Sequence, residues 1–231
     1  MQVNRQIFVT TLLLLISILL FGMSHLDIEI QNLFYNYKSA IWILPKHSEP
    51  YHFLFYDLAR KIPLLLLLAI LILLLFFKKK SWVQTYKKGL IIVMLSIIFV
   101  PSITVGIKNN SNMPCPKHLI EYGGSYPHTS VWEKYSAPYN TLKSQHCWPA
   151  GHASGGFALL SLFFLLRKPR HKRLALTLAL IAGWSMGSYK MLIGDHFFSH
   201  TLITMLLSWL IILVIVKLID RWLPLHKLSD T

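Results

Sequence analysis

Residues 147–157 read CWPAGHASGGF, and in this stretch a polar loop turns into an apolar helix. Pro149 suits the first turn of a helix, because the N–H group that proline lacks would have no intrahelical partner there. The N–H groups of Ala150 and Gly151 would then point out of the positive end of the helix dipole, where phosphate binds. His152 adds a titratable imidazole, which indicates proton transfer at a bound phosphate. An ordinary helix start with an incidental polar residue is the alternative.

The composition around this stretch is that of an integral membrane protein and excludes a soluble globular domain. The chain has 231 residues, of which 54% are hydrophobic, and a mean hydropathy of +0.50. A membrane-spanning helix needs about 20 mostly apolar residues. Six stretches approach this length: 7–23, 62–77, 89–107, 150–166, 174–194 and 198–216. We therefore predict an all-α polytopic membrane protein, a bundle of six transmembrane helices that forms a single domain over residues 1–231, with long loops at 24–61 and 108–149.

The basic residues are concentrated in one set of the segments between these stretches. That set and the chain ends hold 14 of the 23 lysine and arginine residues but only two of the nine acidic residues. The basic members are Arg5, Lys78, Lys79, Lys80, Lys87, Lys88, Arg167, Lys168, Arg170, Lys172, Arg173, Lys217, Arg221 and Lys227, and the acidic ones are Asp220 and Asp230. Because cytoplasmic loops carry the excess of lysine and arginine, this set and both termini are predicted to be cytoplasmic, and the loops 24–61 and 108–149 extracytoplasmic. The net charge of +14 is thus a topology signal and an attraction for anionic lipid, with little support for nucleic acid binding.

The first apolar stretch has a second interpretation, because Arg5 followed by an apolar run also fits a signal peptide. Residues 22–24 offer no convincing small-x-small cleavage site, so we take the stretch as a helix, and the orientation of the others is the same either way. The loop that follows, 24–61, is rich in aromatic residues. This density favours a short amphipathic helix or a cap in the membrane interface.

The two cysteines, Cys115 and Cys147, fall in the same predicted extracytoplasmic loop. In an oxidising compartment the default expectation for such a pair is a disulfide. The bond would tie the beginning of the loop to the residue just before the helix start at 148–152. Two free thiols are the alternative, because the sequence carries no geometry.

A cluster of polar residues lies between the last two apolar stretches. Its members are Lys190, Asp195, His196, Ser199 and His200. Residues 196 and 200 share a face if the last helix begins near residue 198, and polar residues this dense at a membrane boundary are a functional hypothesis by default. With Lys108 after the third stretch and His152 at the start of the fourth, they predict a phosphate site capable of nucleophilic and acid–base chemistry without a metal.

The order and spacing of these residues resemble the type-2 phosphatidic acid phosphatase superfamily of membrane phosphatases. That family has the motifs Lys-x6-Arg-Pro, Pro-Ser-Gly-His and Ser-Arg-x5-His-x3-Asp, and the resemblance covers the last four predicted helices. Lys108 matches the first lysine, with Cys115 and Pro116 at the position of Arg-Pro, and residues 149–152, PAGH, match the second motif. In the third motif the counterparts of Arg, His and Asp are Lys190, His196 and His200.

The resemblance implies a role for each of these residues. His196 would attack phosphorus and form a phosphohistidine, while His152 would protonate the leaving oxygen and later activate water. Two lysines, Lys108 and Lys190, and the N–H groups of Ala150 and Gly151 would hold the phosphoryl oxygens. Two departures weaken the match, since lysine is a point charge where the family has arginine, and His200 replaces a carboxylate that orients the nucleophile. A neutral His200 would still accept a hydrogen bond from His196, and Asp195 is adjacent in sequence.

The function that the resemblance implies is a metal-independent lipid phosphatase with no cofactor, in a bacterial inner membrane and with its active site facing the periplasm. We expect a phosphorylated membrane lipid as partner and infer no obligate protein partner. Lipid A is the expected substrate, because the chain looks like the lipid A phosphatases, and undecaprenyl diphosphate and phosphatidylglycerol phosphate are the alternatives. A lipid-to-lipid phosphotransferase and a non-catalytic lipid-binding or transport protein also stay open. A metal enzyme using His146, His152, His196 and His200 lacks carboxylates at ligand spacing.

Overall fold

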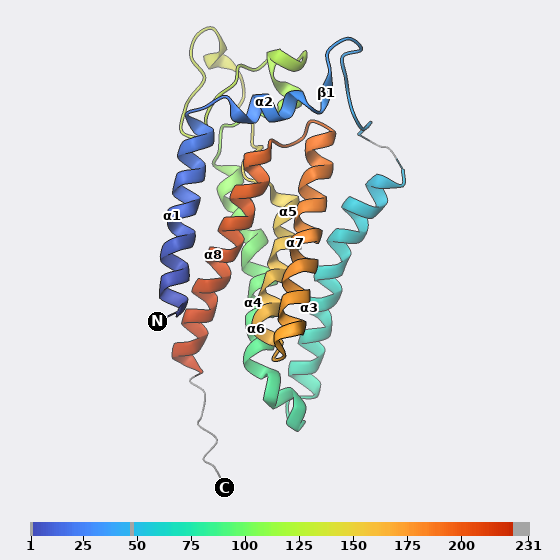
Figure 1. The fold of residues 1–231 in the computed structure, drawn as a ribbon, viewed down its shortest axis with the longest axis vertical. Helices are drawn as coiled ribbons and strands as arrows, with labels where there is room; N and C mark the ends of the chain where they lie inside the picture. The colour runs from blue at the N-terminus through green and yellow to red at the C-terminus, as the bar shows by residue number, and fades with distance from the viewer. Residues whose placement is uncertain (1, 47–48, 224–231) are drawn as a thin grey trace.

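The chain folds into long helices that run roughly parallel, as the computed structural model in Figure 1 shows. The structure describes residues 2–46 and 49–223, and the predicted topology residues Lys227 and Asp230 lie outside them. The α-helices of this part are α1 (Gln2–Gly22), α2 (Leu26–Asn32), α3 (Ala59–Phe76), α4 (Ser81–Asn109), α5 (Gly151–Ala158), α6 (Leu162–Leu165), α7 (Pro169–Leu192) and α8 (Phe198–Trp222). The prediction of a mostly helical protein is therefore confirmed.

Three of the described helices, α1, α4 and α8, are long and apolar enough to cross a membrane, which indicates a membrane protein. Two further apolar helical segments are shorter, Lys61–Phe76 in α3 and Gly151–Leu165 across α5 and α6. Leucines along α3, among them Leu64 and Leu65, are exposed, as expected for a helix that faces lipid. The predicted count of six spans goes beyond these findings and stays a prediction.

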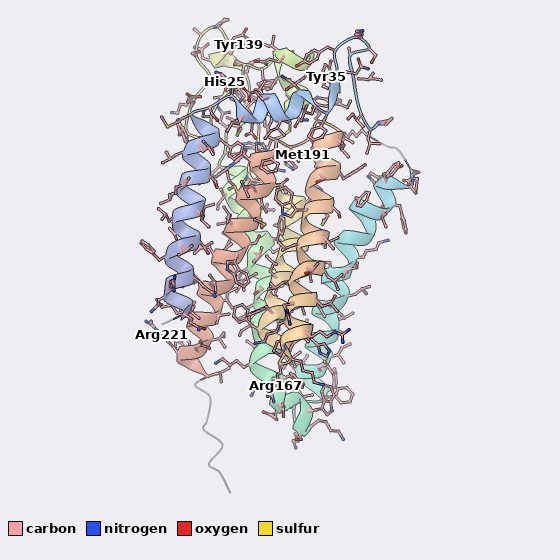
Figure 2. All side chains as sticks on the ribbon, in the orientation of Figure 1. His25, Tyr35, Tyr139, Arg167, Met191 and Arg221 are labelled. Carbon is pink, nitrogen blue, oxygen red and sulfur yellow. A yellow bond between two sulfur atoms is a disulfide. The ribbon has the colours of Figure 1, made fainter. Side chains whose placement is uncertain are left out.

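Several helices extend past the apolar stretches that predicted them. Helix α4 begins at Ser81 instead of residue 89, α7 begins at Pro169 instead of residue 174, and α8 ends at Trp222 instead of residue 216. Seven of these 19 added residues are lysine or arginine, which are good helix formers and whose stems lie along apolar surface while their charges reach water. Figure 2 shows Arg167 and Arg221 at this basic end of the bundle, far from Tyr35 and Tyr139 at the other end.

The core of the bundle forms where α5 packs against α4, α7 and α8. Phe157 on α5 is fully buried there, with Val93 and Val100 of α4 and Ile212 of α8. The α5 and α7 backbones touch, because a Cβ atom on Gly156 would lie only 2.7 Å from the backbone nitrogen of Gly183. The helix ends that carry the polar residues are therefore held in fixed positions relative to one another.

The end of the bundle opposite the basic residues is covered by α2, a small hairpin and the loop 110–150, and we call it the capped end. The hairpin pairs β1 (Tyr35–Asn36) with β2 (Ile41–Trp42), with Tyr35 opposite Trp42. Trp42 packs against Gly194 in the α7–α8 turn, where a Cβ atom would lie 2.3 Å from the indole ring and where φ is +73°. Only glycine combines this backbone with this contact. The aromatic segment predicted as a cap thus reaches the turn that carries His196.

Helix α2 is fixed to the capped end by two buried side chains. Asp27 accepts hydrogen bonds from the backbone N–H and the hydroxyl group of Ser199, at the start of α8. Gln31 donates a hydrogen bond of 2.9 Å to the carbonyl oxygen of Met191, at the end of α7. Asp27 therefore supplies an N-terminal cap to α8 from a distant part of the chain.

Candidate active site

His196 lies where four of the predicted site residues meet. It is only 3% exposed, and its ring interacts electrostatically with His200, Lys108, His152 and Lys190. These four residues lie at the start of α8, the end of α4, the start of α5 and the end of α7. Four helix ends, from three separate parts of the sequence, therefore converge on one imidazole at the capped end.

Burial is the main reason why the pKa of His196 lies well below its usual range, and electrostatic interactions with His200 and Lys108 lower the pKa further. The imidazole of His196 is therefore neutral at neutral pH. A neutral imidazole has one nitrogen without a proton, and that nitrogen can act as a nucleophile.

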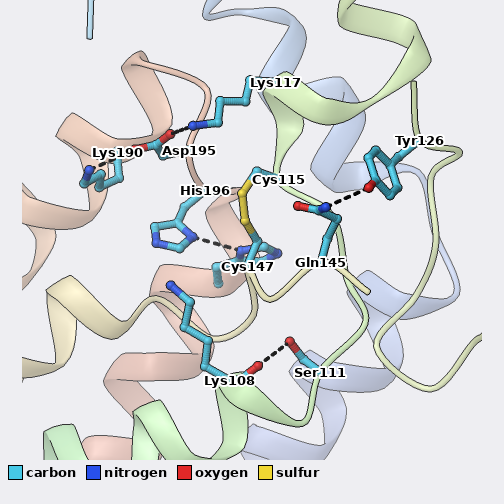
Figure 3. The surroundings of a disulfide bond; sticks show 11 residues. Lys108, Ser111, Cys115, Lys117, Tyr126, Gln145, Cys147, Lys190, Asp195 and His196 are labelled. Atoms are coloured by element: carbon cyan, nitrogen blue, oxygen red, sulfur yellow. Dashed lines mark hydrogen bonds and ion pairs between the residues drawn. A yellow bond between two sulfur atoms is a disulfide. The ribbon is translucent and has the colours of Figure 1, made fainter. Parts of the chain in front are cut away.

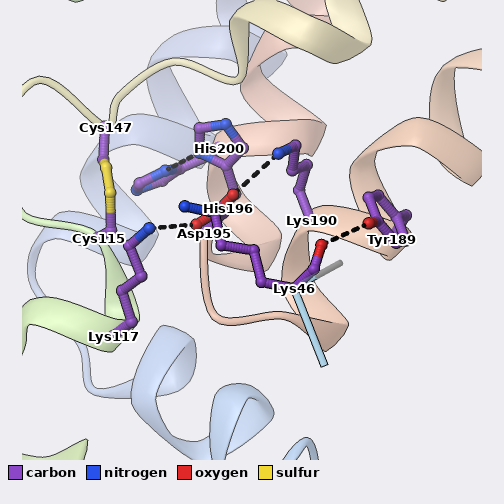
Figure 4. Close-up of polar contacts among 9 residues, drawn as sticks. All are labelled: Lys46, Cys115, Lys117, Cys147, Tyr189, Lys190, Asp195, His196 and His200. Atoms are coloured by element: carbon purple, nitrogen blue, oxygen red, sulfur yellow. Dashed lines mark hydrogen bonds and ion pairs between the residues drawn. A yellow bond between two sulfur atoms is a disulfide. The ribbon is translucent and has the colours of Figure 1, made fainter. Parts of the chain in front are cut away.

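The rings of His196 and His200 are in direct contact, with their Nδ1 atoms 3.2 Å apart (Figure 4). One Nδ1 must donate and the other accept. If His196 donates, its Nε2 atom is the unprotonated nitrogen, and the proton of His200 lies on Nε2. That atom is buried without a hydrogen bond of normal geometry among the described residues, and the backbone of Cys147 lies next to the ring as a weak acceptor. His200 can thus orient His196 in this tautomer.

Asp195 holds two lysines at the mouth of this site (Figures 3 and 4). The Nζ atom of Lys117 lies 2.6 Å from Oδ1, and the Nζ atom of Lys190 lies 2.8 Å from Oδ2. Burial by itself would raise the pKa of Asp195, but the charge of Lys190 and the hydrogen bonds of both lysines outweigh burial and lower it. The carboxylate therefore stays ionised and fixes both ammonium groups. It forms ion pairs with lysines, and its oxygen atoms are not the partner of His196.

The start of α5 differs from the prediction at Ala150. The backbone N–H of Ala150 donates a hydrogen bond of 2.8 Å to the Oγ1 atom of Thr204, and Ala150 is fully buried. The N–H group of Ala150 is therefore not available to a phosphate. The helix begins at Gly151, one residue later than the predicted start at residue 150. The first turn that begins at Gly151 stays open to an anion. A Cβ atom on Gly151 would lie 3.8 Å from Cδ of Lys108, so this lysine lies against the helix start.

A disulfide between Cys115 and Cys147 joins the two ends of the long loop, with Cα atoms 5.2 Å apart (Figure 3). Near one end, the backbone N–H of Lys117 donates to the carbonyl oxygen of Gly194 at 3.0 Å. Near the other end, Trp148 and Pro149 lead directly into α5. The loop is therefore fastened at once to the α7–α8 turn and to the helix that carries His152.

Sequence reasoning missed Lys117 and the part played by Asp195. A signal for Lys117 was present, because it follows Cys115 and Pro116, which stand where the related family has Arg-Pro. The partnership of Lys117 with Asp195 joins positions 78 residues apart, which no local motif reveals. His146, named for the metal alternative, has its Nδ1 atom 2.7 Å from the carbonyl oxygen of Ser111. Within the described part of the chain, no group of three or more His, Cys, Asp or Glu residues is placed to hold a metal ion.

Comparisons with known proteins agree with this arrangement at the level of the family. The PAP2 superfamily matches residues 89–224, which run from within α4 to the end of α8 and include every predicted site residue. No curated protein and no solved structure matches the chain. The match covers more than half of the chain, and it confirms the predicted family. The chain therefore belongs to the PAP2 superfamily, whose members are phosphatases.

Proposed function

We propose that this protein is a metal-independent phosphatase that removes a phosphate group from a membrane lipid through a phosphohistidine on His196. The observation that carries the proposal is the environment of this ring. It is buried and neutral, its Nδ1 atom is bonded to His200, and Lys108 and Lys190 lie around it. A neutral imidazole beside two ammonium groups suits attack on an anionic phosphorus centre, because the cations offset the repulsion.

The proposed reaction has two steps. In the first, Nε2 of His196 attacks phosphorus, the bond from phosphorus to the lipid oxygen breaks, and that oxygen takes a proton from His152. In the second, His152 takes a proton from water, the water oxygen attacks phosphorus, and the P–N bond breaks to release inorganic phosphate. Lys108, Lys190 and the first turn of α5 at Gly151 stabilise the charge on the phosphoryl oxygens in both steps.

We propose that the capped end faces the periplasm of a bacterial inner membrane. The basic residues at the opposite end support this orientation, since lysine and arginine accumulate on the cytoplasmic side. A hollow of about 470 Å³ lies beside the capped end of α4, lined by residues that include Ile103, Ile107 and Trp148. Its lining changes from apolar Ile107 to polar Asn110 and Ser111 on either side of Lys108 in the sequence, which suits a lipid whose phosphate reaches the site. Lipid A is the substrate we propose, in line with the expected subtype.

The experiment measures inorganic phosphate released by the detergent-purified protein in excess chelator. The substrates are lipid A, undecaprenyl diphosphate and phosphatidylglycerol phosphate. The variants are His196→Ala and, as a matched control, His171→Ala, which removes an exposed histidine near the start of α7 at the basic end. We expect release from one lipid, full activity in His171→Ala, and none in His196→Ala.

The other outcomes are equally informative. Activity that survives in His196→Ala, or that the chelator abolishes, would contradict the phosphohistidine mechanism. Loss of the lipid phosphate without release of inorganic phosphate would indicate transfer to a second lipid, because the same phosphohistidine can be intercepted by an acceptor other than water. No phosphate release from any of the three lipids would favour a non-catalytic lipid-binding protein.

A further inference from the structure

We propose that Lys117 is a third phosphate-binding lysine, which completes a site matched to the dianion of a phosphate monoester. The inference rests on the proposed function, since it concerns the same phosphate. Its starting point is the position of the Lys117 ammonium group, 2.6 Å from the carboxylate that also binds Lys190. Lys117 therefore shares an anchor with a lysine that acts electrostatically on His196.

The need to neutralise Asp195 does not explain why the ammonium group of Lys117 lies beside this carboxylate. Lys190, whose side chain is 11% exposed, already pairs with this carboxylate, which is 14% exposed. Bringing a second ammonium group to the same carboxylate removes water from an added charge, and one carboxylate does not neutralise two ammonium groups, so this placement is unfavourable. A group placed at such a cost indicates that an anion from outside the chain completes its environment.

The charge of the cluster indicates which anion. Lys108 interacts electrostatically with both Lys190 and Asp195, so it belongs to the same cluster. Three ammonium groups and one carboxylate leave a net charge of +2. A phosphate monoester carries about −1.5 to −2 at pH 7, whereas a diester carries a single negative charge. The cluster therefore matches a terminal phosphate group.

The backbone holds Lys117 in a position from which it can serve the phosphate. Its N–H donates to the carbonyl oxygen of Gly194, one residue before Asp195, and the disulfide fastens Cys115 two residues earlier. An ammonium group has three N–H donors, so an ion pair with Asp195 leaves donors for a phosphate oxygen. With a side chain 30% exposed, Lys117 is also the most accessible member of its ion-pair triad. Cys115 stands where the related family has a phosphate-binding arginine, and in this arrangement Lys117 supplies the missing cation.

The test compares Lys117→Met and Lys117→Arg with Lys143→Met, a matched control at an exposed lysine of the same loop. On the lipid that wild type hydrolyses, we expect kcat/KM of Lys117→Met to fall by about 10- to 100-fold, mainly through KM, and Lys117→Arg to retain most of it. Lys143→Met is expected to match wild type. The acid limb of the pH profile is expected to stay in place in Lys117→Met, because Lys117 is not among the charges that act on His196.

A second measurement is independent of turnover. Inorganic phosphate is expected to raise the melting temperature of wild type, Lys143→Met and Lys117→Arg, and to raise it much less in Lys117→Met. An unchanged KM and an unchanged response to phosphate in Lys117→Met would overturn the inference. If Lys117→Met does not fold, Lys117→Gln takes its place, and equal responses of Lys117→Gln and Lys117→Arg would overturn it. Failure of the proposed function would instead appear as wild type without turnover or as an active His196→Ala variant.

Discussion

Two carboxylates with little exposure lie near the start of α8, and their surroundings differ. Asp27, 1% exposed, accepts two hydrogen bonds from Ser199, whereas Asp195 binds the ammonium groups of Lys117 and Lys190. Burial raises the pKa of Asp27 to about 6, against a smaller lowering by the hydrogen bonds of Ser199. The pKa of Asp195 is below its ordinary value, because its two lysines outweigh burial.

This difference indicates that Asp27 stabilises the fold, whereas Asp195 positions residues of the proposed site. The N–H and hydroxyl groups of Ser199 are neutral, so they can stay bonded to Asp27 whether it is protonated or ionised. Asp27 therefore caps α8 and holds α2 on the bundle. Asp195 must be ionised to hold its lysines, and one of them, Lys190, acts electrostatically on His196, the nucleophile that we propose. The same substitution, aspartate to asparagine, therefore separates the two roles, because it removes the charge and keeps the shape.

Asp195→Asn is expected to have the largest effect. The amide leaves two ammonium groups partly buried without an anion, which costs about 3 kcal/mol of unfolding free energy. It also releases Lys117 and Lys190, the phosphate ligands that we propose, and their misplacement is expected to lower kcat/KM by about 100-fold. Thermal unfolding in detergent and phosphate release measure the two effects.

The pH dependence of this variant supplies its control. Because the folded pKa of Asp195 is lowered, its contribution to stability is present above the unfolded pKa and is lost as pH falls through the folded pKa. The stability advantage of wild type over Asp195→Asn should therefore shrink in acid. An advantage that grows in acid would show that the ion pairs do not hold Asp195.

The Asp195 cluster also marks the limit of what the sequence reveals about the site. Motif spacing predicted Lys108, His152, Lys190, His196 and His200 as site residues because each motif is local, and a helix end presents its residues together. Lys117 and Asp195 meet only after the loop and the α7–α8 turn have packed, and the use of the Ala150 N–H depends on Thr204 of α8. Contacts between segments decide these features, and one sequence does not contain them.

The fold shows the same limit. Runs of apolar residues located the long helices, because burial in lipid demands them. They did not locate the ends of α4 and α7, where charged residues continue the helix. Nor did they predict the β1–β2 hairpin, whose Trp42 is positioned by its contact with Gly194. Helix interiors follow from composition, while short elements depend on tertiary packing.

Asp27→Asn is expected to have a smaller effect, and one of opposite sign with pH. The folded pKa of about 6 is above the ordinary 3.8, so this group contributes stability below about pH 4 that is lost as pH rises through about 6. The loss amounts to at most about 3 kcal/mol. The asparagine side chain does not titrate. The melting temperature of wild type relative to that of Asp27→Asn should therefore decrease as pH rises from about 4 to about 6.

Activity provides the control for Asp27→Asn. The variant keeps an acceptor for the Ser199 N–H, so α8 and the site residue His200 stay in place. We expect kcat/KM at neutral pH to change by less than about threefold, against the large loss in Asp195→Asn. A loss as large as that of Asp195→Asn would contradict the division of roles between the two carboxylates.

The smallest effect is expected from a third carboxylate, Asp220, at the basic end of α8. Its Oδ1 atom lies 2.6 Å from Nζ of Lys88, the distance found for Lys117 and Asp195, but its side chain is 46% exposed and that of Lys88 is 27% exposed. Water and salt screen such a pair, so Asp220→Asn should cost no more than about 1 kcal/mol, less at high salt, and leave kcat/KM unchanged. Unfolding at low and high salt, with Asp195→Asn alongside, measures the difference. Equal losses of unfolding free energy in the two variants would show that burial at the capped end is not what makes the Asp195 pairs strong. A much larger loss in Asp195→Asn, at the same distance between the charged atoms, would assign the strength of those pairs to the exclusion of water.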